Sequence, residues 1–194
     1  MKKFRLLLLL FLTFQLKVYS QDVDNRINEI RKMYQQTINE KSLYSTKEED
    51  ITWKAFSGDD DSYSKATATN YYDFNKKLKL IILKYSSSGQ LSTFNAKDEL
   101  YYLNDTLYFI YSVNNNITWE EVYKQKGKTY SVTEERIYFG KDGKCIRYLF
   151  KIFEGEHEQI DSLRNKTPNR EFDCLYSKDL VERIEDYLKD EMTP

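Results

Sequence analysis

The sequence predicts an α+β domain in which an N-terminal and a C-terminal helix pack on one face of an antiparallel β-meander of about six strands. Aromatic residues are abundant, with 17 Tyr and 11 Phe in 194 residues, and aromatic side chains favour strands. Strand–turn–strand segments recur in the middle of the chain, and an amphipathic segment lies on either side of them. Because hairpin-built sheets leave one face to be covered, we expect the two helices there.

The first twenty residues have the three-part pattern of a secretory signal peptide. Basic residues occupy three of the first five positions, an apolar run covers Leu6–Phe14, and Val18–Ser20 fits a cleavage site. The apolar run has nine residues, whereas a membrane-spanning helix needs about 20. We therefore expect a signal peptide over residues 1–20, cleavage before Gln21, and a single domain over residues 21–194. The product is expected to be periplasmic or secreted, with no membrane span after cleavage.

The charge of the mature chain argues against nucleic acid as a partner. The whole chain has 30 Lys plus Arg and 31 Asp plus Glu. Removing residues 1–20 takes away four basic residues and no acidic one, which leaves a net charge of −5. A mildly acidic chain is a poor counterion for a phosphate backbone.

An amphipathic helix is predicted from Asp24 to Lys41, with Asp22 or Asp24 capping its first turn. Its apolar residues recur at spacings of three and four, and they are Ile27, Ile30, Tyr34 and Ile38. Alternate residues of a strand share a face, so this stripe is expected to meet Leu107, Phe109, Tyr111, Ile146, Tyr148 and Phe150.

A second helix is predicted at the end of the chain, with Ser177 as its N-cap. Its apolar stripe comprises Leu180, Ile184, Tyr187 and Leu188. We expect it on the same face of the sheet as the first helix.

Three aromatic hairpins are predicted between the helices, and they cover Tyr71–Leu83, Leu100–Tyr111 and Arg136–Phe150. Each turn is rich in Asn, Asp, Gly or Lys, and the first three of these tolerate or favour the positive φ of hairpin turns. One hairpin is marginal in water, so the three are expected to pair edge to edge. The segments predicted to be loops or a short additional strand are Ser57–Thr69, Ser86–Gly89, Asn114–Asn116 and, for the strand, Trp119–Tyr123.

The segment Thr69–Phe150 resembles an uncharacterised family of bacterial, Bacteroidetes-type exported proteins with aromatic β-hairpin repeats. In that group the last copy reads Arg-Tyr-Tyr-Phe, a turn, then Lys-Leu-Ile-Arg. Here Ile137 stands for the first Tyr and Cys145 for the Leu. The resemblance implies an exported protein, and it brings no activity and no catalytic residue with it.

Cys145 and Cys174 are the two cysteines, and an even count in an exported chain predicts a disulfide. Closing a loop of about thirty residues contributes on the order of 3 to 4 kcal/mol in the chain-entropy model. The alternative is a reactive thiol, but nothing in the sequence marks either cysteine as activated.

Arg136 and Arg147 flank the third hairpin turn and are the candidate residues for contact with an anion or another ligand. The alternative is that they form cross-strand ion pairs with Glu134 and Glu135.

No catalytic, cofactor-binding or metal-ligating set is predicted. His157, the one histidine, lies among three glutamates, which fits a solvated segment better than a metal site. Asp59–Asp61 lack the alternating spacing and the closing Glu of a calcium loop. Trp53 and Trp119 are candidates for an exposed aromatic platform, although a small domain also needs large side chains in its core.

These observations favour a non-enzymatic binding or interaction module of the cell envelope or exterior, with a protein or glycan as its ligand. The alternative is a carboxylate-dependent hydrolase, because Asp and Glu are frequent and only the fold shows whether two of them meet. Two carboxylates in unlike environments within a cleft would favour the hydrolase. A flat or mildly concave aromatic sheet face would favour the binding module.

Overall fold

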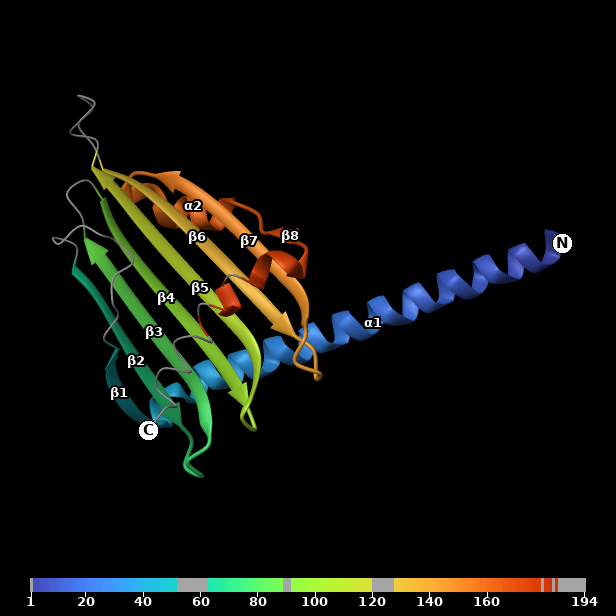
Figure 1. The fold of residues 1–194 in the computed structure, drawn as a ribbon, viewed down its shortest axis with the longest axis horizontal. Coiled ribbons are helices and arrows are strands. Elements are labelled where there is room, and N and C mark those ends of the chain that lie inside the picture. Colours follow the sequence, from blue (N-terminus) through green and yellow to red (C-terminus); the bar gives the residue numbers. More distant parts are fainter. Residues whose placement is uncertain are drawn as a thin grey trace.

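The computed structural model describes residues 2–51, 63–88, 92–119, 128–178, 180–182 and 184, and it shows an α+β fold (Figure 1). A long helix, α1 (Lys2–Glu40), leads through the 3₁₀ turn η1 (Lys41–Leu43) into one antiparallel sheet. The sheet has eight strands, which are β1 (Ser45–Ile51), β2 (Tyr63–Tyr72), β3 (Leu78–Ser88), β4 (Ser92–Leu103), β5 (Thr106–Trp119), β6 (Lys128–Phe139), β7 (Cys145–Gly155) and β8 (Arg170–Phe172). The 3₁₀ turn η3 (His157–Gln159) and helix α2 (Ile160–Lys166) follow β7, and the 3₁₀ turn η4 (Cys174–Ser177) follows β8.

The predicted antiparallel meander is confirmed, because the strands lie in the order β1 to β8 and each pairs with the next. The prediction of about six strands is too low, since it omits the two edge strands. β1 reads Ser-Thr-Lys-Glu-Glu-Asp-Ile and shows no apolar alternation. Charged edge strands of this kind discourage pairing with another sheet. β8 has only three residues, all exposed.

The strands extend into residues that the sequence places in loops. Tyr63–Thr69, Ser86–Ser88 and Asn114–Asn116 are strand residues, and Trp119 ends β5 instead of starting a new strand. Gly89 and residues 52–62 and 120–127 lie outside the described residues. These Ser, Thr and Asn residues continue the backbone ladder towards the end of the sheet away from the hairpin turns. Most of them face no core cluster there, so polar side chains are tolerated in a regular strand.

The three predicted hairpins repeat one local irregularity. In β3, β5 and β7 the register shifts by one residue just after the turn, which leaves Lys79, Tyr108 and Ile146 as the extra residues. Such bulges bend a strand and increase its twist. All three therefore bend the same end of the sheet, and α1 crosses the sheet near this end (Figure 1).

Two of the hairpin turns share a backbone conformation. In the turns Asp73–Lys77 and Gly140–Lys144 the amide of the fourth residue donates to the carbonyl of the first. The fourth residues, Lys76 and Gly143, have φ of 61° and 75°. The remaining turn, Asn104–Asp105, has positive φ at both residues, as its sequence predicts.

The sheet carries a hydrophobic core on each face. On one face the predicted stripe of α1 is confirmed: Ile27 and Ile30 are buried against a sheet cluster formed by Leu80, Ile82, Tyr101, Tyr108, Phe109 and Tyr138. Leu180 and Ile184 are also buried, but they pack on the opposite face against residues such as Ile81, Leu83, Leu100, Ile110 and Ile137. The prediction that both helices share one face is therefore wrong. The physical reason is visible in Leu80–Leu83, a continuous aliphatic run that points to both faces and requires cover on both.

The bulges also decide which strand residues meet α1. Phe109, Tyr111 and Ile146 lie in the α1 cluster as predicted, whereas Leu107, Tyr148 and Phe150 belong to the cluster on the opposite face. The prediction assumes unbroken alternation along each return strand. The extra residues Tyr108 and Ile146 shift that alternation by one.

α1 runs without a break from Lys2 to Glu40, so Asp22 and Asp24 lie inside the helix and neither is its N-cap, contrary to the prediction. Asp24 instead pairs with Arg147, with Oδ1 3.5 Å from Nη2. Arg26 Nε donates to the Phe139 carbonyl at 3.3 Å and ties α1 to the end of β6.

The predicted disulfide between Cys145 and Cys174 is confirmed, with the two Cα atoms 5.8 Å apart. It joins the start of β7 to the start of η4. Ser177 ends η4 directly before the helical residue Lys178, and its hydroxyl donates to the Cys174 carbonyl at 2.7 Å. Asp173 caps η4 by accepting from the Leu175 amide. Tyr187 and Leu188 lie outside the described residues.

Candidate functional site

The face of the sheet that carries α1 is only partly covered. α1 packs on the row of residues nearest the hairpin turns, and α2 packs on β7. Two hollows on this face adjoin at Tyr111. The smaller, of about 300 Å³, lies against Ile30, Arg31 and Tyr34 of α1. The larger, of about 650 Å³, we call the basic groove, and its lining comprises Thr67, Lys84, Tyr85, Ser86, Asn95, Ala96, Lys97, Tyr111, Val113, Asn115 and Arg164.

Three cationic side chains, Lys84, Lys97 and Arg164, line the basic groove, and none of its described lining residues is a carboxylate. Lys84 of β3 and Lys97 of β4 are direct cross-strand partners. Like charges at such positions destabilise a sheet. Lys97 is partly neutralised by Glu99, with Nζ 2.7 Å from Oε1. Lys84 is exposed and forms no ion pair with any residue in the described part of the chain.

The rest of the groove lining supplies hydrogen-bonding groups and one aromatic ring. Thr67 and Ser86 provide hydroxyls, and Asn95 and Asn115 provide amides. The guanidinium of Arg136 lies 5.0 Å from the centre of the Tyr111 ring. Burial, together with the nearby charge of Glu134, raises the pKa of Tyr111 to about 12, so this phenol stays protonated at neutral pH.

A buried ion cluster fixes the cations beside the groove. Glu134 is 0% exposed and pairs with Lys151 Nζ at 3.2 Å, Arg136 Nη2 at 3.0 Å and Arg164 Nε at 2.7 Å. Burial alone would raise the pKa of Glu134. The hydrogen bond from Lys151 and the charges of Lys151, Arg136 and Arg164 outweigh it, so the pKa lies below its ordinary value.

A second buried carboxylate lies two strands away from Glu134, on β4. The Tyr101 hydroxyl donates to Glu99 Oε2 at 2.6 Å, and Lys97 pairs with Glu99 Oε1. Burial and the adjacent Glu99 charge raise the pKa of Tyr101 well above its ordinary value. The Tyr101 hydroxyl therefore stays protonated and remains the donor to Glu99.

The structure places both predicted arginines on the α1 face, but carboxylates already engage them. Arg136 pairs with Glu134, one of the predicted carboxylates, but both residues lie on β6, so the pair is not the predicted cross-strand one. Arg136 Nη1 donates to Asn169 Oδ1 at 2.7 Å. Arg147 pairs with Asp24 and Glu171 and not with Glu134 or Glu135. Arg136 also lines the smaller hollow beside α1.

The remaining sequence candidates do not gather into a site. His157 begins η3, is exposed, and has its ring 5.0 Å from that of Tyr130. Asp59–Asp61 and Trp53 lie outside the described residues, as does the side chain of Trp119. Within the described ranges no three His, Cys, Asp or Glu side chains are close enough to hold a metal ion.

Sequence reasoning misses Lys84, Lys97 and Arg164. Each lysine stands alone in its strand, and only the register of β3 against β4 brings the two together. Arg164 belongs to α2, a helix of seven residues without a readable amphipathic repeat. A Cβ at Gly155 would lie 2.6 Å from Leu163 Cδ1 of α2, so a larger residue there would require the Leu163 side chain to shift.

No protein-family model, curated protein or solved structure matches this chain. Of the helices that the structure describes, none combines the length and the apolar character needed to cross a membrane.

Proposed function

We propose that the chain is an exported, non-enzymatic binding module whose basic groove takes an elongated acidic glycan. The carrying observation is the direct cross-strand placement of Lys84 and Lys97 in an open groove. An arrangement that costs stability in the free protein is favourable when an anion bridges the two ammonium groups.

The class of ligand follows from the other lining groups. A carboxylated or sulfated sugar chain presents anions and hydroxyls in alternation. The groove offers Lys84 for the anions, together with Lys97 and Arg164, which also pair with carboxylates. It offers Thr67, Ser86, Asn95 and Asn115 for the hydroxyls. The disulfide fits an oxidising compartment outside the cytoplasm, where such glycans occur.

The alternative of a carboxylate-dependent hydrolase receives less support from this face. A general acid needs a raised pKa so that it holds a proton near neutral pH. Glu134 has the opposite property, because Lys151, Arg136 and Arg164 keep it ionised. Its geometry suits the positioning of cations and not the delivery of a proton.

The test is calorimetric titration of the purified exported protein with polygalacturonate and chondroitin sulfate, with neutral dextran as the uncharged reference. We expect both polyanions to bind, more weakly as salt increases, and dextran not to bind. Lys84→Ala and Lys97→Ala should each weaken binding about tenfold, the loss of one charge-assisted contact. The matched control is Lys32→Ala, which removes an exposed lysine of α1 outside the groove.

A stability measurement separates a binding role from a structural one. Lys84→Ala removes one member of the like-charged pair, so its urea midpoint should stay unchanged or rise while affinity falls. If neither polyanion binds, or if Lys32→Ala weakens binding as much as Lys84→Ala, the proposal is wrong. Binding of polyglutamate alone would assign the groove to an acidic protein and reject the glycan.

A further inference from the structure

The hairpin end of the sheet carries exposed apolar side chains that the fold does not use. Phe74 in the β2–β3 turn is 93% exposed, Leu43 in η1 is 79% exposed, and Leu103 at the end of β4 is 40% exposed. The turns containing Phe74 and Leu103 are neighbours, because Lys77 Nζ donates to Asn104 Oδ1 at 3.5 Å. Leu43 lies beside them, since β1 pairs Ser45 with Tyr72 at the edge of the first turn.

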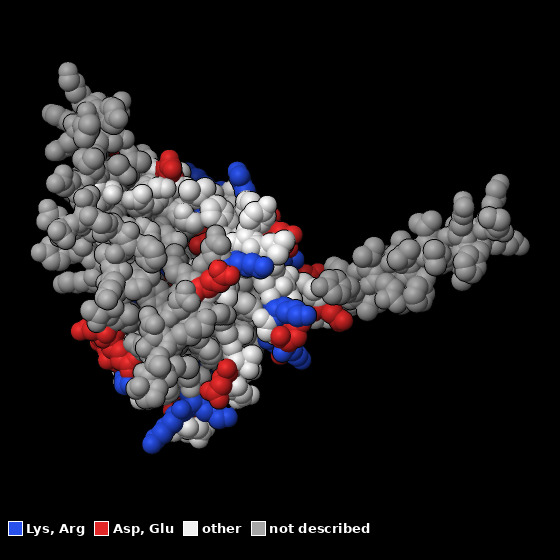
Figure 2. Space-filling model, in the orientation of Figure 1, with Lys and Arg blue, Asp and Glu red and all other residues white. Residues whose placement is uncertain are grey.

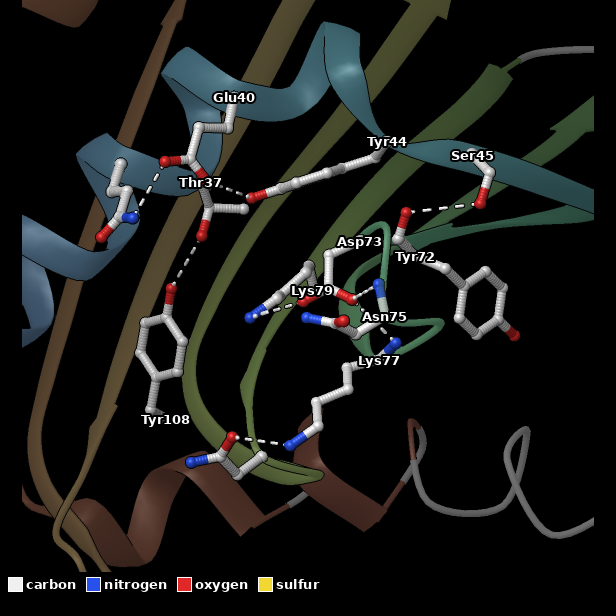
Figure 3. Close-up of polar contacts among 12 residues, drawn as sticks. Thr37, Glu40, Tyr44, Ser45, Tyr72, Asp73, Asn75, Lys77, Lys79 and Tyr108 are labelled. Carbon is white, nitrogen blue, oxygen red and sulfur yellow. Dashed lines mark hydrogen bonds and ion pairs between the residues drawn. The ribbon is translucent and has the colours of Figure 1, made fainter.

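The tip that presents Phe74 is held rigidly (Figure 3). Asp73 Oδ1 accepts from the amides of Asn75 and Lys77, and its Oδ2 pairs with Lys79 at 3.3 Å. These backbone hydrogen bonds and the Lys79 contact lower the pKa of Asp73, so the carboxylate stays charged and keeps the turn closed. A turn of this type accepts most residues at the Phe74 position. The exposed ring is therefore not required by the turn.

Lysines lie in the first turn, beside the apolar tips. This turn carries Lys76 and Lys77, Asp73 pairs with Lys79, and the neighbouring second turn carries Asp105. In the third turn Lys144 pairs with Asp142 at 3.8 Å, and Lys141 lies beside Glu29 of α1. Figure 2 shows basic side chains projecting from the lower end of the molecule, where the β2–β3 turn lies in Figure 1. The first two turns and Lys79 together carry three lysines and two aspartates, so this part of the surface is net positive in a chain whose net charge is −5 once residues 1–20 are removed.

One of these lysines occupies a backbone position that disfavours it. Lys76 has φ of 61°, and the equivalent residue of the third hairpin is Gly143 with φ of 75°. Glycine adopts this left-handed conformation without penalty, and a side chain makes it less favourable. The first turn therefore retains a cation at a place where glycine would be the easier residue.

We propose that this hairpin end is a docking surface for an anionic lipid bilayer. Phe74, Leu103 and Leu43 enter the boundary between headgroups and acyl chains, and the lysines contact lipid phosphates. The combination of rigid apolar tips with the lysines of the first turn matches the chemistry of that interface, where apolar burial and attraction to anionic lipid add together. The contact is peripheral and independent of the basic groove.

The first test is flotation of the purified exported protein with anionic vesicles of phosphatidylcholine and about 30% phosphatidylglycerol, because anionic lipid attracts basic segments. Vesicles of phosphatidylcholine alone are the uncharged reference. We expect binding to the anionic vesicles that weakens with salt, and Phe74→Ser should reduce it about tenfold or more, as expected for loss of one buried aromatic side chain. The matched control is Phe94→Ser, which removes a ring that is 37% exposed near the far end of β4.

A second measurement reports insertion directly. Phe74→Trp and Phe94→Trp each add one indole to the two natural tryptophans. Brominated phosphatidylcholine in the vesicles quenches an indole that enters the bilayer. The difference in quenching between each variant and the natural protein measures the depth of the added indole. The indole at position 74 should be quenched and that at position 94 should not. Failure of the natural protein to bind anionic vesicles, equal losses for the two serine variants, or an unquenched indole at position 74 would each overturn the proposal. Because Phe74 is almost fully exposed, its variants are expected to keep the thermal midpoint of the natural protein.

Discussion

Replacement of Glu134 by Gln should destabilise the domain strongly, because three cations surround this buried carboxylate. The three cations differ in the partners that remain to them after Glu134 is replaced. Arg136 retains Asn169 and Arg164 retains Asp161. Lys151 is itself buried and retains the Arg164 carbonyl and the Phe153 ring, but no carboxylate among the described residues. Breaking a buried pair by removing one partner costs about 3 to 5 kcal/mol. We expect about 3 to 4 kcal/mol for Glu134→Gln, since two of the three cations have another partner.

The same reasoning predicts a partial rescue. If the unpaired Lys151 ammonium dominates the cost, Glu134→Gln with Lys151→Met should recover about 1 to 2 kcal/mol relative to Glu134→Gln alone. The control is Glu171→Gln, the same chemical change in an exposed pair with Arg147. It should change the free energy of unfolding by less than about 1 kcal/mol. Urea unfolding at pH 7 with a constant m value measures all three variants.

The pH dependence supplies an independent check on Glu134. Its folded-state pKa lies below the ordinary 4.5, so its contribution is present above the unfolded-state pKa and is lost as the pH falls through the folded-state pKa. Glu134→Gln should therefore flatten the loss of stability on acidification below about pH 4.5. A cost no larger than that of Glu171→Gln, or a double variant less stable than Glu134→Gln, would refute this account of the cluster.

Three further outcomes are expected. Ile30→Ala should lower the free energy of unfolding by about 2 to 4 kcal/mol, because Ile30 is fully buried, and the exposed Gln35→Ala should change it little; similar small effects in urea would mean that α1 is not docked by this face. Replacement of Cys145 and Cys174 by Ser should lower it by on the order of 3 to 4 kcal/mol, and reduction of the natural protein by dithiothreitol should shift the thermal midpoint in the same direction. Intact mass of the exported protein should begin at Gln21 or its cyclised form, and a mass that includes Leu6–Phe14 would contradict cleavage.

The features that the sequence predicts correctly are those encoded in local patterns. The stripe of α1 is readable because its apolar residues follow the helical period. The hairpin turn at Asn104–Asp105 is readable because both residues favour positive φ. The disulfide is readable from the even cysteine count together with the expected export of the chain.

The features that the sequence does not predict depend on strand register or on burial by segments that are distant in the sequence. Each bulge moves one residue to the other face, and no residue type marks Tyr108 or Ile146 as the extra one. Glu134 lies in the polar stretch Thr133–Arg136 and resembles a surface residue. It is nevertheless buried, because Lys151 and Arg164, which belong to segments farther along the chain, pack over it. The groove lysines illustrate the same point, because a one-residue change of register would separate Lys84 from Lys97.

The meander order has a consequence for the course of folding. Each strand pairs only with its neighbours in the chain, so the sheet can assemble hairpin by hairpin with short loop closures. α1 is different, since Arg26 and the Phe139 carbonyl that it contacts are 113 residues apart. The first element to be synthesised is therefore among the last to be buried, and its Ile27 and Ile30 face water until β3 to β6 are in place. Contacts that form this late mainly set the unfolding rate, so weakening the α1 stripe should shorten the lifetime of the folded protein more than it slows its formation.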